Sequence, residues 1–164
     1  MDDLYWSSFT RRIAVRAPIA TIYKAWTCKQ EIERWFLSSA DFADDKGRAL
    51  ATDESVGAGG TYGWRWFNFD DQEHGRILKA NGTDHLQFTF AGECPVDVQL
   101  SQIGKDVVVE LTQSKIPTDD ASKKGIRLGC DQGWSFFLVN LKSVYEGGLD
   151  LRDKEGVVKA AVNS

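Results

Sequence analysis

The sequence predicts an α+β domain in which one long C-terminal helix covers a curved antiparallel sheet of about six or seven strands. Residues 124–148 place bulky apolar side chains at steps of three and four, which is the period of a helix. Residues 73–113 hold short alternating runs separated by turn residues, a pattern typical of an antiparallel meander. Strands that precede a helix, and do not alternate with it, indicate the α+β class.

The predicted C-terminal helix has one broad apolar face, formed by Trp134, Phe137, Leu138, Leu141, Val144 and Tyr145. Gly147 and Gly148 supply a stop signal, because glycine adopts left-handed backbone without strain. The helix is too polar to cross a membrane, which needs about 20 nearly unbroken apolar residues. Glycine inside a helix is unfavourable by about 1 kcal/mol relative to alanine, so we interpret Gly133 as a point where neighbouring backbone approaches closely.

The N-terminal part of the chain predicts one strand and two short helices. Residues 9–16 alternate between apolar and polar side chains, and Pro18 suits the first turn of a helix that continues to Trp26. Thr27 and Gln30 have the spacing of a capping box, which would start a second short helix through residue 36. The acidic, small-residue run 38–60 predicts one or two short edge strands and a loop.

The remaining strands follow from alternation and turn residues. In the run after Gly60, Tyr62, Trp64 and Trp66 share one face of a predicted strand. Asn81 and Gly82 form a turn between two later strands. The full set of predicted strands in this part of the chain is 61–69, 73–79, 85–90, 96–103 and 107–113.

Composition limits the classes of protein that the chain can belong to. A length of 164 residues fits one domain, 1–164, and 42% hydrophobic with 27% charged residues is typical of globular proteins. A net charge of −4 argues against nucleic-acid binding, which needs clustered basic residues. The acidic N-terminus lacks the apolar run of a secretory signal, so we expect a cytoplasmic protein. Cys28, Cys94 and Cys130 are too widely spaced to predict a disulfide framework or zinc site, and we expect no cofactor.

Several segments carry a family resemblance in a fixed order: RRIAVRAPIATIYKAWT, EIERWF, GGTYGW, HGRIL and GWSFFLVNLKSVYEGG. Together they resemble the family named after the C-terminal domain of the activator of heat-shock protein 90 ATPase, from about residue 9 to residue 152. The resemblance implies the helix-grip, or START-like, fold, in which a curved sheet grips the terminal helix with a cavity between them. It also implies a chaperone as one conceivable partner.

The predicted site is a cavity between the terminal helix and the sheet. Any single ring there is more simply explained as core, but so many large rigid rings are hard to pack without leaving space. We therefore predict non-enzymatic binding of a small hydrophobic or aromatic molecule. The predicted lining is Tyr62, Trp64, Trp66, Phe88, Phe90, Trp134, Phe137, Leu138, Leu141 and Tyr145.

Two alternative functions stay open at this point. A cyclase or hydratase would need polar groups in the cavity, for which Tyr62, Tyr145 and Arg76 are the available candidates. An interaction module would dock on a chaperone through the acidic loop 38–55. A homodimer is a further open alternative, because symmetric dimers are common and the sequence assigns no patch to one.

The sequence predicts no catalytic residue and no metal ligand. His74 and His85 are interpreted as surface or turn residues without an orienting carboxylate. Glycines between residues 57 and 63 lack dinucleotide-binding spacing, and the acidic run 41–45 misses the calcium-loop pattern.

Overall fold

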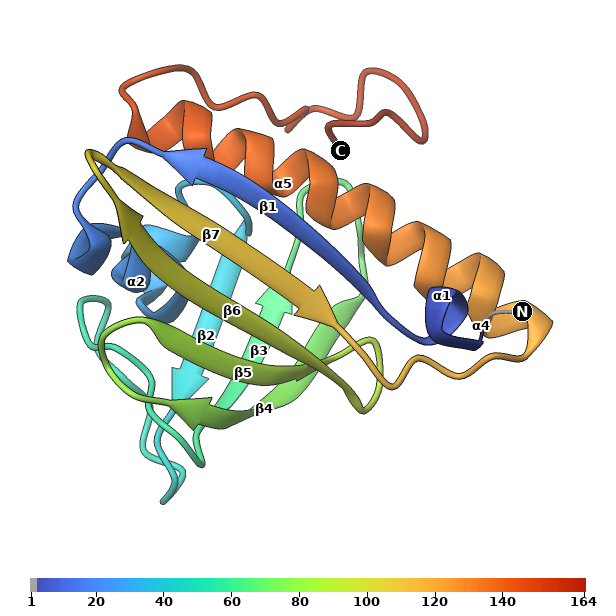
Figure 1. Cartoon of the computed structure of the whole chain (residues 1–164), viewed down its shortest axis with the longest axis horizontal. Helices are drawn as coiled ribbons and strands as arrows, with labels where there is room; N and C mark the ends of the chain where they lie inside the picture. Colours follow the sequence, from blue (N-terminus) through green and yellow to red (C-terminus); the bar gives the residue numbers. More distant parts are fainter. Residues whose placement is uncertain (1–2) are drawn as a thin grey trace.

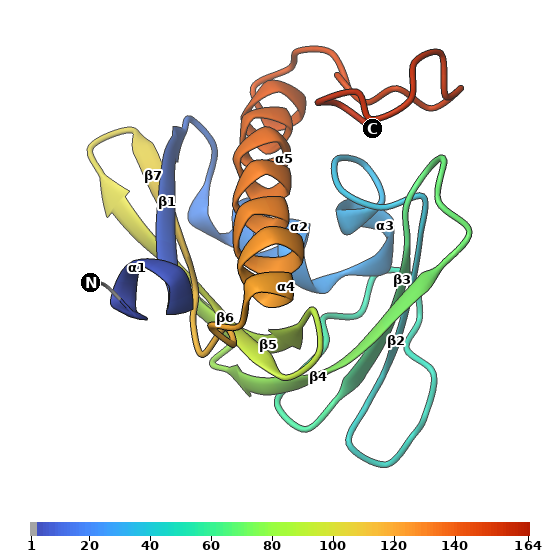
Figure 2. The same ribbon diagram turned by 90° about the vertical axis from the view of Figure 1, so that its right-hand side faces the viewer.

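The computed structural model describes residues 3–164, and Met1 and Asp2 of the predicted domain lie outside the described residues. Within residues 3–164 the chain forms a seven-stranded antiparallel sheet in the order β1-β7-β6-β5-β4-β3-β2. The long helix α5 (Gly129–Tyr145) lies against this sheet, which curves around it (Figures 1 and 2). The α+β class and the helix-grip arrangement are thereby confirmed.

The elements follow one another in the predicted order, with a short N-terminal helix added. Their bounds are α1 Asp3–Ser7, β1 Phe9–Val15, α2 Ile19–Thr27, α3 Lys29–Ile32, β2 Ser39–Ala43, β3 Thr61–Arg65, β4 Gln72–Ala80, β5 His85–Phe90, β6 Cys94–Ile103, β7 Asp106–Gln113, α4 Asp120–Ser122, the π-helix η1 Lys123–Leu128, and α5.

Alternation explains how the meander buries one face. Along β7 every second residue is buried, and Val107, Val109 and Leu111 all face the core. Val109 pairs with Ile13, so the first strand of the chain completes the sheet beside the last. Val15 pairs with Val107 in the same way, and these apolar pairs lie on the face that α5 covers, which fixes the register.

Both edges of the sheet are capped by side chains from neighbouring helices. Beside β1, the Lys142 ammonium of α5 donates to the Ala14 carbonyl at 2.7 Å. Beside β2, Lys29 donates to the Ala40 carbonyl at 2.6 Å, and the Glu33 carboxylate accepts from the Ala40 N–H at 2.9 Å. Exposed backbone at a sheet edge can pair with a further strand, so these contacts protect the edges from such pairing.

The C-terminal helix differs from the single α-helix predicted over 124–148. Asp119 caps α4 by accepting from the Ser122 N–H at 2.9 Å, and the chain then passes through the wider π-turn η1 before α5. Arg127 of η1 points inward, where it donates to the Tyr5 carbonyl at 2.7 Å and pairs with Asp131 at 2.8 Å. π-Turns are rare and occur mostly as single turns within helices.

Three local predictions were wrong. Thr27 does not cap α3, because it is the last residue of α2 and its hydroxyl donates back to the Tyr23 carbonyl at 2.9 Å. Residues 33–36 form a turn instead of continuing α3. Trp66 follows β3 in the loop toward β4, because pairing between these strands ends at Arg65.

Most of the space between α5 and the sheet is solid. The rings of Trp26 and Trp35 meet edge-on at 4.7 Å, and the Trp35 N–H donates to the Ala25 carbonyl at 2.8 Å. Tyr62 and Trp64 stack at 3.8 Å on the sheet side. Across residues 3–164, no helix combines the length and apolar content needed to cross a membrane.

Candidate functional site

A cleft of about 170 Å³ opens beside the beginning of α5, where the solid core ends. One wall is the surface of η1 and α5, and the other is a group of rings from the sheet and from the turn after α3. The lining comprises Phe36, Trp66, Phe90, Gly125, Gly129, Cys130, Gly133, Trp134 and Phe137. The cleft is therefore almost entirely apolar.

Three glycines line the helix side of this cleft, so no side chain projects into it from their positions. Gly125, Gly129 and Gly133 are spaced four residues apart, and a Cβ atom added at any of them meets no atom within 4 Å. The interpretation of Gly133 as a close backbone contact is thus wrong. Each glycine weakens a helix by about 1 kcal/mol relative to alanine, and packing does not require it here. What the glycines provide is open space.

The aromatic wall is held in place by mutual contacts. Phe36 stacks on Trp134 at 5.1 Å and meets Trp66 and Phe137 edge-on at 5.5 and 4.9 Å. The Trp134 N–H donates to the Gln113 side-chain oxygen at 3.0 Å, which fixes its ring plane. Such pairs favour defined geometries, so the rings hold one another in fixed orientations.

Cys130 supplies the polar side chain among the residues that line the cleft. Burial raises the pKa of the Cys130 thiol to about 11, so this group stays protonated near neutral pH. Gln113 is fully buried behind Trp134 and is not among the residues that line the cleft. The side chains that line the cleft therefore carry no charge near neutral pH.

The structure brings four of the ten predicted lining residues to the cleft: Trp66, Phe90, Trp134 and Phe137. Trp64, Phe88, Leu138 and Leu141 lie instead in the packed core. Phe36, Cys130 and the three glycines were missed as lining residues. The spacing of the glycines was a usable signal, since a four-residue repeat places them on one helix face.

The polar candidates for catalysis do not converge. The Tyr62 ring lies over Gly75 of β4, and its hydroxyl donates to the Thr89 carbonyl at 2.6 Å. Burial raises the pKa of this hydroxyl. The Tyr145 hydroxyl donates to the Glu31 carboxylate at 2.7 Å, between α5 and α3. Arg76 pairs with Glu93 at 2.7 Å on the other face of the sheet. Each group is thus occupied by a different partner.

His85 has a carboxylate partner that the sequence did not reveal. Its Nε2 atom lies 3.0 Å from the Asp97 carboxylate on the neighbouring strand β6, where Gln87 also donates at 3.0 Å. The prediction that neither histidine has an orienting carboxylate is therefore wrong for His85. No nucleophile or cleft accompanies this pair among the contacts of residues 3–164, so it is a surface contact.

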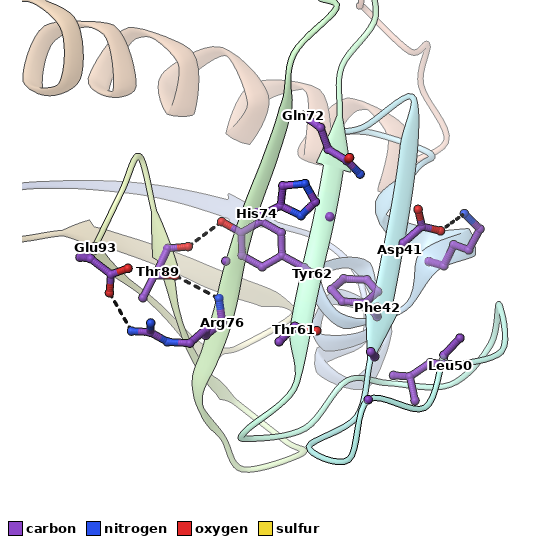
Figure 3. Close-up of a pocket in the computed structure, with 16 residues that line it drawn as sticks. Asp41, Phe42, Leu50, Thr61, Tyr62, Gln72, His74, Arg76, Thr89 and Glu93 are labelled. Carbon is purple, nitrogen blue, oxygen red and sulfur yellow. Dashed lines mark hydrogen bonds and ion pairs between the residues drawn. The ribbon is translucent and has the colours of Figure 1, made fainter.

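A larger hollow of about 660 Å³ lies on the face of β2–β4 turned away from α5. Figure 3 shows His74 and Arg76 along this surface, with Glu93 on one side and Asp41 on the other. Its charges are paired, Lys29 with Asp41 at 3.7 Å and Arg76 with Glu93. The charged side chains that line this hollow already have partners, whereas the smaller cleft is lined almost wholly by apolar groups, and we place the candidate site in the cleft.

The loop 38–55 shows internal pairing of its charges. Arg48 pairs with Asp44 at 3.2 Å and with Glu54 at 2.8 Å. The hydrogen bond from Arg48 is the main cause that lowers the pKa of Glu54 to about 2. Elsewhere, residues 3–164 contain no group of three or more His, Cys, Asp or Glu side chains that could hold a metal ion.

The curved sheet, the gripped helix and the cleft beside it define a helix-grip domain of the START-like class. The sequence family described as "Activator of Hsp90 ATPase homolog 1-like protein" matches residues 16–146. The chain belongs to this family.

Solved structures of distant relatives share the fold. The protein SSP2350 from Staphylococcus saprophyticus is 21% identical, with a TM-score of 0.69 over 88% of this chain and 96% of that one. The Aha1 dimer from Colwellia psychrerythraea is 20% identical, with a TM-score of 0.66 over 86% and 97%. CalU16 from Micromonospora echinospora is 20% identical, with a TM-score of 0.60 over 87% and 76%. No curated protein matches the sequence.

Proposed function

We propose that this domain binds a small, mainly apolar molecule in the cleft between the glycine stripe of η1 and α5 and the aromatic wall. The observation that carries the proposal is the glycine stripe, Gly125, Gly129 and Gly133, which keeps space open that alanine would fill without a clash. A helix that accepts three weakening residues without a packing need for them is best explained by a ligand that uses the space.

The size of the cleft limits the ligand. An apolar cavity of about 150 Å³ is known to admit a benzene molecule, and the cleft measures about 170 Å³. One planar ring with a small substituent fits between the bare helix and the rings of Phe36 and Trp134. The protonated Cys130 thiol is a weak hydrogen-bond donor, which favours a substituent with an acceptor atom, such as a carbonyl or hydroxyl oxygen.

The composition of the wall supports binding over catalysis. Acid–base chemistry needs titratable groups within hydrogen-bonding distance of a common point. Cys130 is the titratable side chain among the lining residues of the described chain, and burial keeps it protonated. A cyclase or hydratase would need at least one further polar group beside the ligand.

A filled cleft tests the proposal. Gly133→Leu places a side chain in the open space, whereas Gln132→Leu adds the same side chain to the exposed surface of the same helix. We expect benzyl alcohol to shift the amide resonances of Gly129 and Gly133 in wild type and in Gln132→Leu, with saturable titration. Gly133→Leu should lose the titration while keeping its thermal stability. Equal titration of all three proteins would contradict the proposal.

A further inference from the structure

The helix that lines the cleft is irregular where the cleft begins. Residues 123–128 form the π-turn η1, and Gly125 within it lines the cleft together with Gly129 and Gly133 of α5. A π-turn closes hydrogen bonds between residues five apart, so it takes in one residue more than a turn of α-helix. The π-turn therefore changes which side chains before Gly129 face the cleft.

The extra residue of the π-turn decides whether Gly125 or Ile126 faces the cleft. In an uninterrupted α-helix, two turns of 3.6 residues span about seven residues, and they would lead back from Gly133 to Ile126. With one π-turn, the corresponding residue is Gly125, which lines the cleft. Ile126 is instead partly buried against the core and is not among the lining residues. The π-turn thus keeps a branched side chain out of the space opposite the aromatic wall.

The side chain of Arg127 anchors the π-turn. It is buried, its Nε atom donates to the Tyr5 carbonyl of α1 at 2.7 Å, and its guanidinium pairs with Asp131 at 2.8 Å. The guanidinium also lies 4.8 Å from the ring centroids of Tyr5 and Phe9. Breaking buried contacts of this kind leaves charged and polar groups without partners, so they hold Arg127 strongly.

The short helix α1 holds the other end of this anchor. It lies beside the beginning of the C-terminal helix on the side of β1, whereas β3 lies on the opposite side of α5 (Figures 1 and 2). The Lys123 ammonium, at the start of the π-turn, lies 5.2 Å from the centroid of the Trp6 ring. The Ser7 carbonyl accepts from the Ile116 N–H at 3.0 Å. α1 therefore contacts both the π-turn and the segment that follows β7.

We propose that Arg127 is a positioning residue for the cleft: by tying the π-turn to α1, it keeps Gly125 opposite the aromatic wall and Ile126 in the core. This inference rests on the proposed function of the cleft. π-Turns are rare and the α-helix is the common helical state, so η1 relaxes to an α-helix once the anchor is removed. The Ile126 side chain then turns into the cleft and takes the space of the ligand.

Arg127→Met removes the anchor and keeps a long, unbranched side chain in its place. Arg11→Met is the matched control, because Arg11 also pairs with Asp131, at 2.7 Å, but belongs to β1 and is 44% exposed. We expect Arg127→Met to lose the saturable benzyl alcohol titration of the Gly129 and Gly133 amides, and Arg11→Met to retain it. A crystal structure of Arg127→Met should show an α-helix over residues 123–128, with the Ile126 side chain in the cleft.

A second substitution, Ile126→Ala, separates positioning from a general loss of structure. Added to Arg127→Met, it should restore the titration, whereas alone it should leave the wild-type titration unchanged. A merely destabilised fold would not be repaired by truncating a further side chain. If Arg127→Met does not fold, Tyr5→Ala weakens the same anchor more mildly, because it removes only a ring that is 57% exposed. Tyr5→Ala should then weaken binding, and Ile126→Ala should restore it.

Three results would overturn the role of Arg127 while benzyl alcohol binding by wild type leaves the proposed function standing. The first is undiminished binding by Arg127→Met or, where that variant does not fold, by Tyr5→Ala. The second is a loss of binding that Ile126→Ala does not restore. The third is a crystal structure of Arg127→Met that retains the π-turn. If wild type does not bind benzyl alcohol, the proposed function fails, and this inference fails with it.

Discussion

The contact between α5 and the sheet has two halves that both contain large aromatic side chains. One half is tightly packed, and the other contains the cleft. Away from the glycines the interface is closed, with Leu141, Trp26, Trp35 and Trp64 at 0–1% exposure. Around Gly129 the rings of Phe36 and Trp134 face a cleft. Aromatic density is therefore a poor guide to a cavity. The helix positions opposite the rings decide whether the space is filled.

The largest expected effect on stability comes from Trp134, and it tests whether this ring is part of the packed core as well as of the cleft wall. Its ring is 3% exposed and contacts Trp26 at 5.9 Å and Phe90 at 5.1 Å. Trp134→Ala should lower the free energy of unfolding by about 3–5 kcal/mol, since large core truncations leave a cavity. Trp66→Ala, on the more exposed cleft wall, should cost about 1 kcal/mol. Urea unfolding measures both, and equal losses would erase the distinction.

The next effect compares one substitution at two glycines. In the closed half, a Cβ at Gly75 would overlap the Tyr62 ring, so Gly75→Ala should displace that ring and break its bond to Thr89. Overpacking of this kind costs about 1–3 kcal/mol. Thermal and urea unfolding should show the loss. Stability equal to that of wild type would mean that the ring can move aside freely.

In the open half, the same change should have the opposite sign. Gly129→Ala meets open space and removes a residue with poor helix propensity, so stability should rise by about 1 kcal/mol. The added methyl group occupies part of the cleft, so affinity for benzyl alcohol should fall. Calorimetric melting measures the change in stability, and titration of amide resonances measures the affinity for benzyl alcohol. A variant that gains stability and keeps full affinity would show that the space serves no ligand.

The smallest effect concerns Asp150, in the segment that follows α5, at low pH. Burial alone would raise the pKa of Asp150, but hydrogen bonds from Arg152, Lys154 and Asn140 outweigh it and hold the pKa well below its usual range. A depressed carboxylate pKa stabilises the fold above the unfolded value of about 3.9 and loses that contribution as pH falls below it. Wild type should therefore exceed Asp150→Asn in stability at pH 6, and the difference should shrink at about pH 3. A constant difference would mean that the charge is unimportant.

Much of the fold could be predicted because periodicity is local. The alternation of Val107, Val109 and Leu111 and the helical spacing from Trp134 to Leu141 each depend on a few neighbouring residues. The turn after α3 and the π-turn at 123–128 could not be predicted. Their geometry depends on distant partners, such as the Tyr5 carbonyl that draws Arg127 inward.

The candidate site was harder to predict than the fold for the same reason. Trp64 and Trp66 look equivalent in sequence, but β3 ends between them and only Trp66 reaches the cleft wall. Phe36 was assigned to a helix and is instead placed by a turn. Gly133 was correctly noticed, and its open side could be recognised only once the facing surface was known.

The capped edges of the sheet determine how this domain can assemble. On the outer side of β2, Ala40 is bound by Lys29 and Glu33, and the Phe42 carbonyl accepts from the Leu50 N–H at 2.9 Å. An incoming strand would have to displace two charged side chains and a backbone contact before it gained its first ladder bond. Association by extending the sheet is therefore blocked at β2. A second copy or another protein would have to recognise side-chain surfaces, where single substitutions can alter the choice of partner.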